Sequence, residues 1–205
     1  ASAEQLQQEA QSVAESLCHQ YPNMAEALHV AALFHSQTRQ SGEAEKLWRE
    51  CIELDPKHVG YYVNLAAIAM ERGESEEAVE TLERAMDANC LSLDVYHHMA
   101  VSLTKLGRCD EAERVIREGL KSYPQSPACW LVLGQAQLKL GKVEQAETAL
   151  RKAIELGARS TDVYFALANA CARQGKQEEA AEFRKRFTEL KESQALYPQQ
   201  RFQVL

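Results

Sequence analysis

The chain has 205 residues, a formal net charge of −7 and 45% hydrophobic residues. This acidic balance argues against nonspecific binding to nucleic acid, which needs an excess of Lys and Arg to neutralise phosphates. No run of about 18 or more apolar residues occurs, so no transmembrane helix is predicted. The chain starts at Ala1 with neither Met nor a signal-like segment, as expected of a processed protein or a piece of a longer one.

Residues 3–21 form the first predicted helix, because their apolar side chains recur at steps of three and four. These are Leu6, Ala10, Val13, Ala14 and Leu17. Ala10 lies 34 residues before Ala44, so this helix has the register of half of a repeated segment. We expect residues 1–24 to be the second helix of a repeat, either a cap or the remainder of a longer array.

The 34-residue spacing continues through the rest of the chain and relates a row of alanines, a row of glycines and a row of aromatic residues. The rows are Ala44, Ala78, Ala112, Ala146 and Ala180; Gly73, Gly107, Gly141 and Gly175; and Tyr62, Tyr96, Trp130 and Tyr164. This period is the signature of a helix-turn-helix solenoid. Five repeats are predicted, at residues 25–58, 59–92, 93–126, 127–160 and 161–194.

Each repeat is predicted to pair two helices around a short turn, as near 25–38 and 42–54 in the first repeat. Glycine suits this turn, because it adopts a left-handed conformation beyond a helix end without a steric cost. Arg39 replaces it in the first repeat. The last helix, at 177–191, is polar, as the solvated end of an array requires. Residues 195–205 form a tail without the repeat pattern.

These rows resemble the tetratricopeptide repeat family. In the fourth repeat, five residues follow the family pattern: Trp130, Leu133, Gly134, Ala146 and Leu150. The resemblance implies an all-α, right-handed superhelix of about five helix-turn-helix repeats. It also implies a noncatalytic scaffold for protein–protein interaction, with the first helix of each repeat lining a concave groove.

In this register the candidate groove residues mix apolar side chains with amides and imidazoles. They are His29, Leu33, Val63, Asn64, His97, His98, Val101, Leu131, Gln135, Leu138, Phe165 and Asn169. Such a surface suits an extended peptide or a helix of a partner protein. A carboxylate clamp used by part of the family is predicted to be absent, because only Asn64 matches it.

Three basic residues recur 34 residues apart at the rim of the groove: Lys105, Lys139 and Arg173. They form either a positive row for an acidic segment or ordinary cations at the solvent-facing end of a helix. Both interpretations are kept.

No catalytic or metal-binding motif is present: the sequence has no Walker-type loop, HExxH, GxSxG or dinucleotide fingerprint. The pairs Glu76-Glu77 and Glu178-Glu179 open second helices, where negative charge favours the helix dipole. His29 and His97 are two repeats apart, too far to share one metal ion. We therefore expect no enzymatic activity, no cofactor and no metal site.

Six cysteines are irregularly spaced and form no C-x-x-C pair: Cys18, Cys51, Cys90, Cys109, Cys129 and Cys171. We expect mostly reduced, structural residues, because a buried free cysteine behaves as a small hydrophobe. This favours a cytoplasmic location.

Two alternatives remain open for the function. The repeats could be the substrate-recruiting or regulatory region of a larger enzyme. The chain could also self-associate as a homo-oligomer, with Tyr197, Phe202 and Leu205 of the tail docking into a neighbouring groove.

Overall fold

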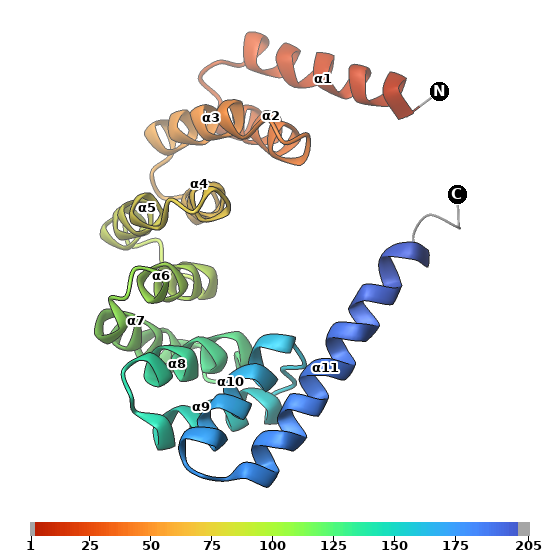
Figure 1. Cartoon of the computed structure of the whole chain (residues 1–205). Helices are drawn as coiled ribbons and strands as arrows, with labels where there is room; N and C mark the ends of the chain where they lie inside the picture. Colours follow the sequence, from red (N-terminus) through yellow and green to blue (C-terminus); the bar gives the residue numbers. More distant parts are fainter. Residues whose placement is uncertain (1–2, 201–205) are drawn as a thin grey trace. The chain divides into compact units, whose positions relative to one another are not determined.

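The computed structural model describes residues 3–200 of the chain, and side chains for residues 5–193. Within residues 3–200 all regular structure is helical, which confirms the predicted all-α class. The helices, drawn in Figure 1, are α1 (Ala3–Gln20), α2 (Ala25–Gln37), α3 (Ser41–Leu54), α4 (Val59–Arg72), α5 (Ser75–Asp87), α6 (Leu93–Lys105), α7 (Cys109–Ser122), α8 (Pro127–Lys139), α9 (Val143–Glu155), α10 (Thr161–Arg173) and α11 (Gln177–Gln200). None of these described helices is both long and apolar enough to cross a membrane.

The chain divides into two compact units, an N-terminal unit up to Ser102 and a C-terminal unit from Leu103. In the N-terminal unit, each helix from α1 to α4 packs against the one that follows it. In the C-terminal unit, α7 packs on α8 and α8 on α9, while α10 contacts α8, α9 and α11. Figure 1 shows α2 and α3 running side by side as one such helix pair.

The turn inside each repeat requires a left-handed backbone. Gly73 has a φ of 83°, and the equivalent glycines of the next three repeats have φ values of 78°, 75° and 76°. Arg39 occupies the same place in the first repeat with a φ of 61°. A side chain with a Cβ is disfavoured there, because Cβ approaches the following carbonyl oxygen. The glycine row therefore reflects a backbone requirement.

Two first helices of the C-terminal unit begin at serine caps. Ser126 Oγ accepts a hydrogen bond from the backbone nitrogen of Cys129 at 3.3 Å, and Ser160 Oγ accepts one from Val163 at 3.4 Å. Each cap satisfies a donor that the helix itself leaves unpaired. Pro127 follows the first cap, at a position where its missing N–H costs no helical hydrogen bond.

The alanine row lies where the two helices of a repeat meet. All five of its members are 0% exposed: Ala44, Ala78, Ala112, Ala146 and Ala180. The residue four positions later is a large, fully buried side chain in the first four repeats: Trp48, Leu82, Ile116 and Leu150. Small residues let the helices approach, and the large ones fill the remaining space, as close packing requires.

The last helix is longer than predicted. The sequence places its end near Lys191, because the repeat pattern stops there, whereas α11 continues to Gln200. The segment after Lys191 contains Gln, Ala and Leu, which are good helix formers without any repeat register. Loss of the pattern therefore marked the end of the array and not the end of the helix.

Candidate functional site

His29 is half-buried and bonded within the N-terminal unit. Its ring centroid lies 5.1 Å from that of Tyr61 and 5.9 Å from that of His58, both near the start of α4. Its Nδ1 accepts a hydrogen bond of 3.0 Å from Trp48 Nε1. Burial, and then the neighbouring charge of His58, lower the pKa of His29. His29 is thus a neutral acceptor that joins α2 to α3.

His97 and His98 are adjacent on α6, with ring centroids 5.4 Å apart. Burial is the largest cause that lowers the pKa of each ring, and Asp94 acts in the opposite direction on both. The buried Nδ1 of His98 has no hydrogen-bond partner in the part of the chain that is described. The two imidazoles are therefore neutral and half-buried.

The other predicted groove residues of the N-terminal unit differ in exposure. Leu33 of α2 is 37% exposed, and the neighbouring Val30 is 53% exposed. Val63 and Asn64 of α4 and Val101 of α6 are half-buried. The apolar character is therefore most accessible on α2.

In the C-terminal unit the predicted positions lie on α8 and α10, which pack against each other. Leu131, Gln135 and Asn169 are half-buried. Phe165 is 55% exposed, and its ring centroid lies 5.7 Å from that of Phe187 on α11. The Phe165 ring lies beside Phe187 and is still accessible, so it is the most exposed apolar side chain among these predicted positions.

Leu138 is a correction to the predicted groove. It is only 9% exposed and belongs to the core cluster that includes Ala166 and Ala170 of α10. The side chain faces the neighbouring first helix and is covered by it. Leu138 is consequently a core residue and not a contact for a partner.

Two of the three rim cations donate hydrogen bonds to backbone oxygens of the protein itself. Lys139 Nζ donates to the backbone oxygen of Thr104 at 2.6 Å, and an Arg173 Nη1 donates to the oxygen of Leu138 at 2.8 Å. Both carbonyls lie in the last turn of a first helix, where each also accepts from the N–H of a turn glycine, Gly107 at 3.3 Å or Gly141 at 3.2 Å. Lys139 and Arg173 thus stabilise the helix ends of the preceding repeats. Lys105 is exposed.

A glutamate on the second helix joins consecutive repeats. Glu147 Oε1 accepts from Arg151 at 2.7 Å, and its Oε2 accepts from Lys176 at 2.7 Å and from Gln174 at 2.6 Å. Burial acts to raise the pKa of Glu147, but these hydrogen bonds outweigh it and hold the pKa at about 2. The carboxylate therefore stays ionised between two cations.

The same arrangement recurs one repeat earlier. Glu113 accepts from Arg117 at 2.8 Å, from Lys142 at 2.6 Å and from Gln137 at 3.0 Å. Burial acts to raise its pKa as well, and the hydrogen bonds again hold it at about 2. In the N-terminal unit, Glu45 similarly accepts from two cations, Arg49 and Arg72. We call Glu45, Glu113 and Glu147 the ladder glutamates.

Arginines of the ladder also reach the next repeat. Arg49 pairs with Glu77, and Arg151 pairs with Glu179, each over 28 residues. From the sequence, the only role predicted for Glu77 and Glu179 was a favourable interaction with the helix dipole. The equal spacing of the two Arg–Glu pairs was the signal that could have revealed these contacts.

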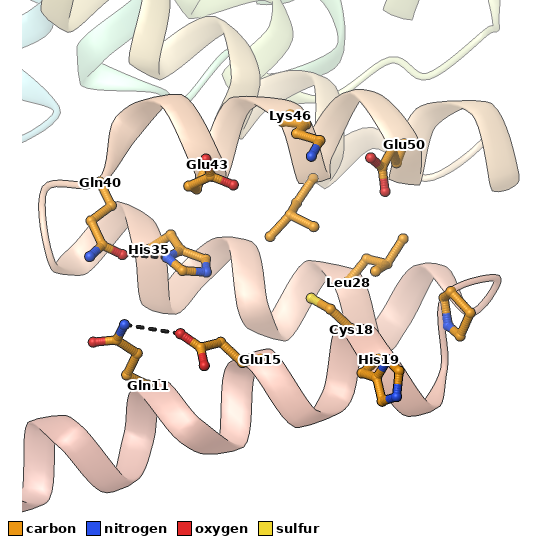
Figure 2. A pocket seen from close by; sticks show the side chains of 12 residues that line it. Gln11, Glu15, Cys18, His19, Leu28, His35, Gln40, Glu43, Lys46 and Glu50 are labelled. Carbon is orange, nitrogen blue, oxygen red and sulfur yellow. Dashed lines mark hydrogen bonds between the residues drawn. The ribbon is translucent and has the colours of Figure 1, made fainter.

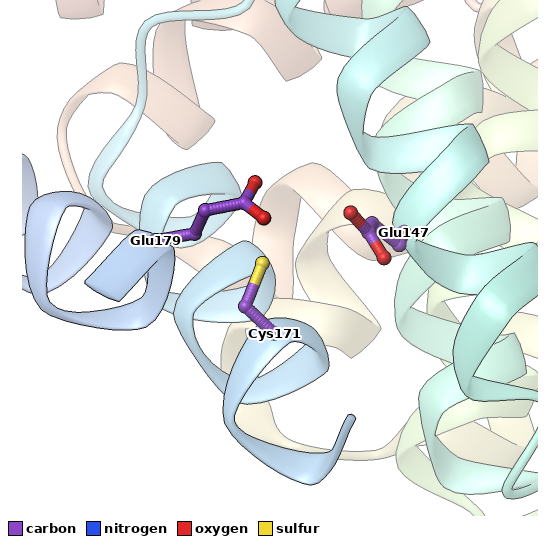
Figure 3. A group of neighbouring side chains, drawn as sticks. All are labelled: Glu147, Cys171 and Glu179. Carbon is purple, nitrogen blue, oxygen red and sulfur yellow. The ribbon is translucent and has the colours of Figure 1, made fainter. Parts of the chain in front are cut away.

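One group of described side chains has the composition of a metal site. Ligand atoms of Glu147, Cys171 and Glu179 lie within 4.8 Å of one another (Figure 3). Arg151 pairs with both carboxylates. Burial, and then the two carboxylates, raise the pKa of the Cys171 thiol. The cations of the protein already occupy the carboxylates, so we interpret this group as part of the ladder.

A cavity of about 560 Å³ lies where α1 meets α2 and α3 (Figure 2). Leu28 and Leu47 supply its apolar lining, and charges of both signs border it, including Glu15 and Lys46. Sequence reasoning missed it, because it depends on how α1 packs on the first repeat. Its mixed charges indicate no single ligand class.

The side chains of the predicted docking tail lie outside the described part of the chain. Phe202 and Leu205 lie beyond the described residues, and the side chain of Tyr197 is likewise not described. Self-association through the tail stays a prediction.

The chain matches three family models, each described as tetratricopeptide repeat, over residues 25–58, 47–80, and 99–160 together with 131–195. No curated protein matches it.

Solved structures share the fold at low sequence identity. MamA from Desulfovibrio magneticus is 18% identical with a TM-score of 0.72, covering 83% of this chain and 96% of MamA. YrrB, described as a TPR protein with an unusual peptide-binding site, is 15% identical with a TM-score of 0.70, covering 91% and 97%. The pilF protein of Pseudomonas aeruginosa is 20% identical with a TM-score of 0.70, covering 80% and 75%. The helix pairs, the turn glycines and these matches agree: the chain belongs to the tetratricopeptide repeat family.

Proposed function

We propose that the chain is a noncatalytic scaffold for protein–protein interaction, and that it holds a peptide or a helix of a partner along the first helices of its repeats. The main support is the exposure of apolar side chains on those helices. Val30 and Leu33 of α2 and Phe165 of α10 are 53%, 37% and 55% exposed. Covering them with a partner removes apolar surface from water, which favours association.

Polar residues among these apolar ones would orient the partner. Asn64, Gln135 and Asn169 carry amides that both donate and accept hydrogen bonds, and all three remain half-exposed. A mixture of apolar anchors and amides fits an extended polypeptide better than a small apolar ligand. The peptide-binding description of YrrB supports this class of ligand by analogy of fold.

The rim contributes less than its sequence suggests. All three cations of this row are exposed, but Lys139 and Arg173 also donate to helix carbonyls. We extend the proposal to Lys105 as a residue that steers an acidic end of the partner, which affects the association rate more than the affinity.

Peptides selected from a random-sequence display library against the whole chain provide the probe. Their dissociation constants are then measured by fluorescence anisotropy for the wild type and for Leu131→Glu and Phe165→Glu. We expect each variant to weaken binding by about tenfold or more, because a buried charge replaces an apolar anchor.

The matched control is Leu91→Glu. Leu91 is 46% exposed but lies outside the first helices, so binding should be unchanged. Circular dichroism checks that each variant keeps its helices. Unchanged affinity in folded Leu131→Glu and Phe165→Glu variants would reject this surface as the binding site.

A further inference from the structure

At one junction between repeats the arginine of the ladder is present, but the next repeat offers it no carboxylate. Glu77 and Glu179 pair with the arginines of the preceding repeats, Arg49 and Arg151. In the fourth repeat the equivalent residue is Gln145, and the arginine of the preceding repeat is Arg117. Within the described residues Arg117 pairs only with Glu113, and its side chain is 52% exposed. An uncharged amide therefore takes the place of the carboxylate that pairs with the arginine at the other two junctions.

A cavity of about 220 Å³ lies at this junction, between α7, α8 and α9. The side chains that matter for its chemistry are Arg117, Trp130, Leu133, Gln137, Gln145 and Ala149. Trp130 Nε1 already donates to the oxygen of Pro124 at 2.8 Å, so the indole offers the cavity an apolar surface. None of the lining residues is a predicted groove residue.

Gln137, which lines the cavity, is held by its neighbours. Gln137 is 1% exposed, and its Nε2 donates to Glu113 at 3.0 Å and to Gln145 Oε1 at 3.5 Å. These two acceptors fix the orientation of the amide. Its Oε1 is buried and has no partner among the described residues. Because this oxygen is buried, a ligand in the open cavity meets the cation of Arg117 and the indole of Trp130.

We propose that this cavity binds an acidic residue within a segment of a partner protein. The ligand carboxylate pairs with Arg117, as Glu77 and Glu179 pair with the arginines at other junctions. Neighbouring aliphatic groups of the segment cover the half-exposed indole of Trp130. The net charge of −7 opposes general attraction of acidic chains, so binding depends on this local set. The site is separate from the groove.

The test uses the whole ¹⁵N-labelled chain and a capped tripeptide with glutamate between two leucines. The chain has two tryptophans. Trp130 lines the cavity, whereas Trp48 is 1% exposed in the N-terminal unit and serves as the internal control. We expect a saturable shift of the Trp130 indole N–H signal and none for Trp48. The same tripeptide with glutamine should bind about fivefold more weakly or worse, because it has no charge for Arg117.

Three variants separate the roles. Arg117→Gln removes the cation, and Gln145→Glu supplies the missing carboxylate from within the protein, so each should weaken binding of the glutamate peptide by about fivefold or more. Arg114→Gln removes an exposed cation from the same helix and should leave binding unchanged. Gln145→Glu adds an ion pair and should not lower the thermal midpoint, so weaker binding in that variant would not arise from unfolding.

The proposal fails if Trp130 shows no saturable shift, or if the glutamine peptide binds as tightly as the glutamate peptide. Equal binding by wild type, Arg117→Gln and Gln145→Glu would also overturn it. Free glutamate that binds as tightly as the peptide would indicate a small-molecule site and contradict a partner segment as the ligand.

Discussion

Nδ1 of His29 accepts the indole hydrogen of Trp48 across 3.0 Å, and this bond joins the two helices of the first repeat. Trp48 is 1% exposed, so water cannot replace His29 as the acceptor. The bond requires an imidazole that is unprotonated at Nδ1. The stability of this repeat is therefore coupled to the charge state of His29.

Replacing His29 with leucine should destabilise the first repeat by about 1–3 kcal/mol, because a buried indole N–H loses its acceptor. Urea unfolding followed by Trp48 fluorescence, in a Trp130→Phe background, measures the change. His19→Leu is the control: His19 is exposed, and its replacement should change the free energy of unfolding by less than about 0.5 kcal/mol. Equal effects of the two substitutions would show that the hydrogen bond contributes nothing.

Acidification should weaken the N-terminal unit through its histidines. Burial lowers the folded-state pKa of His29, His97 and His98 below the ordinary value of 6.5. Below that value the unfolded chain binds protons that the folded chain does not, so stability falls as the pH drops through 6.5 toward the folded-state pKa. Urea midpoints at pH 7.5 and 5.5 should differ, and less so in His29→Leu. A variant with an unchanged pH dependence would exclude His29 from this effect.

Arg39→Gly should stabilise the chain by up to about 1 kcal/mol. Arg39 has a φ of 61°, at the place where four other repeats have glycine. Glycine removes the steric cost of a left-handed backbone, which exceeds its own entropic cost. The reverse substitution, Gly141→Arg, should shift the thermal midpoint in the opposite direction. Midpoints that move the same way for both would show that the backbone conformation does not control stability here.

Removing a ladder glutamate should cost stability at neutral pH. In Glu147→Gln, Arg151 and Lys176 lose the carboxylate that both contact, and we expect a loss of about 1–3 kcal/mol. Glu118→Gln is the control, since the Glu118 side chain is 55% exposed and its ion pair with Lys121 lies on the surface. Chemical denaturation at pH 7 measures both, and a larger loss for the control would contradict the assignment.

The ladder also has a distinct acid dependence. The folded-state pKa of Glu147 is about 2, below its ordinary 4.5. The stabilisation is therefore complete above pH 4.5 and is lost as the pH falls toward 2. Glu147→Gln should flatten the decrease in stability between pH 5 and pH 2, as measured by thermal midpoints. A decrease as steep as that of the wild type would assign acid sensitivity to other carboxylates.

The fold could be predicted from the sequence because the 34-residue period reflects requirements of the backbone and of the core. The spacing of Gly73 and its equivalents reflects a left-handed turn, and the spacing of Ala44 and its equivalents reflects a close helix contact. Both requirements depend on one residue type at one place, so the pattern is visible without coordinates. The serine caps at Ser126 and Ser160 act on a similarly local scale.

The surface was predicted less well, because side-chain partners are chosen across repeats. The sequence left open whether Lys139 and Arg173 belong to a free basic row, and both bond to carbonyls of the preceding repeats. Leu138 looked like a groove residue, yet α10 covers it. The repeat register predicts which helix carries a residue. Whether that residue can contact a partner depends on what the neighbouring helix covers.

The 28-residue step from Arg151 to Glu179 has a consequence for altering the length of the array. Excision of residues 127–160 would bring Glu179 to the place that Gln145 now holds, and Lys176 to that of Lys142. Arg117 would then face a glutamate instead of an amide. A protein that lacks this repeat would be better matched in charge at its splice than the parent at the same junction, so the Arg–Glu spacing favours excision here.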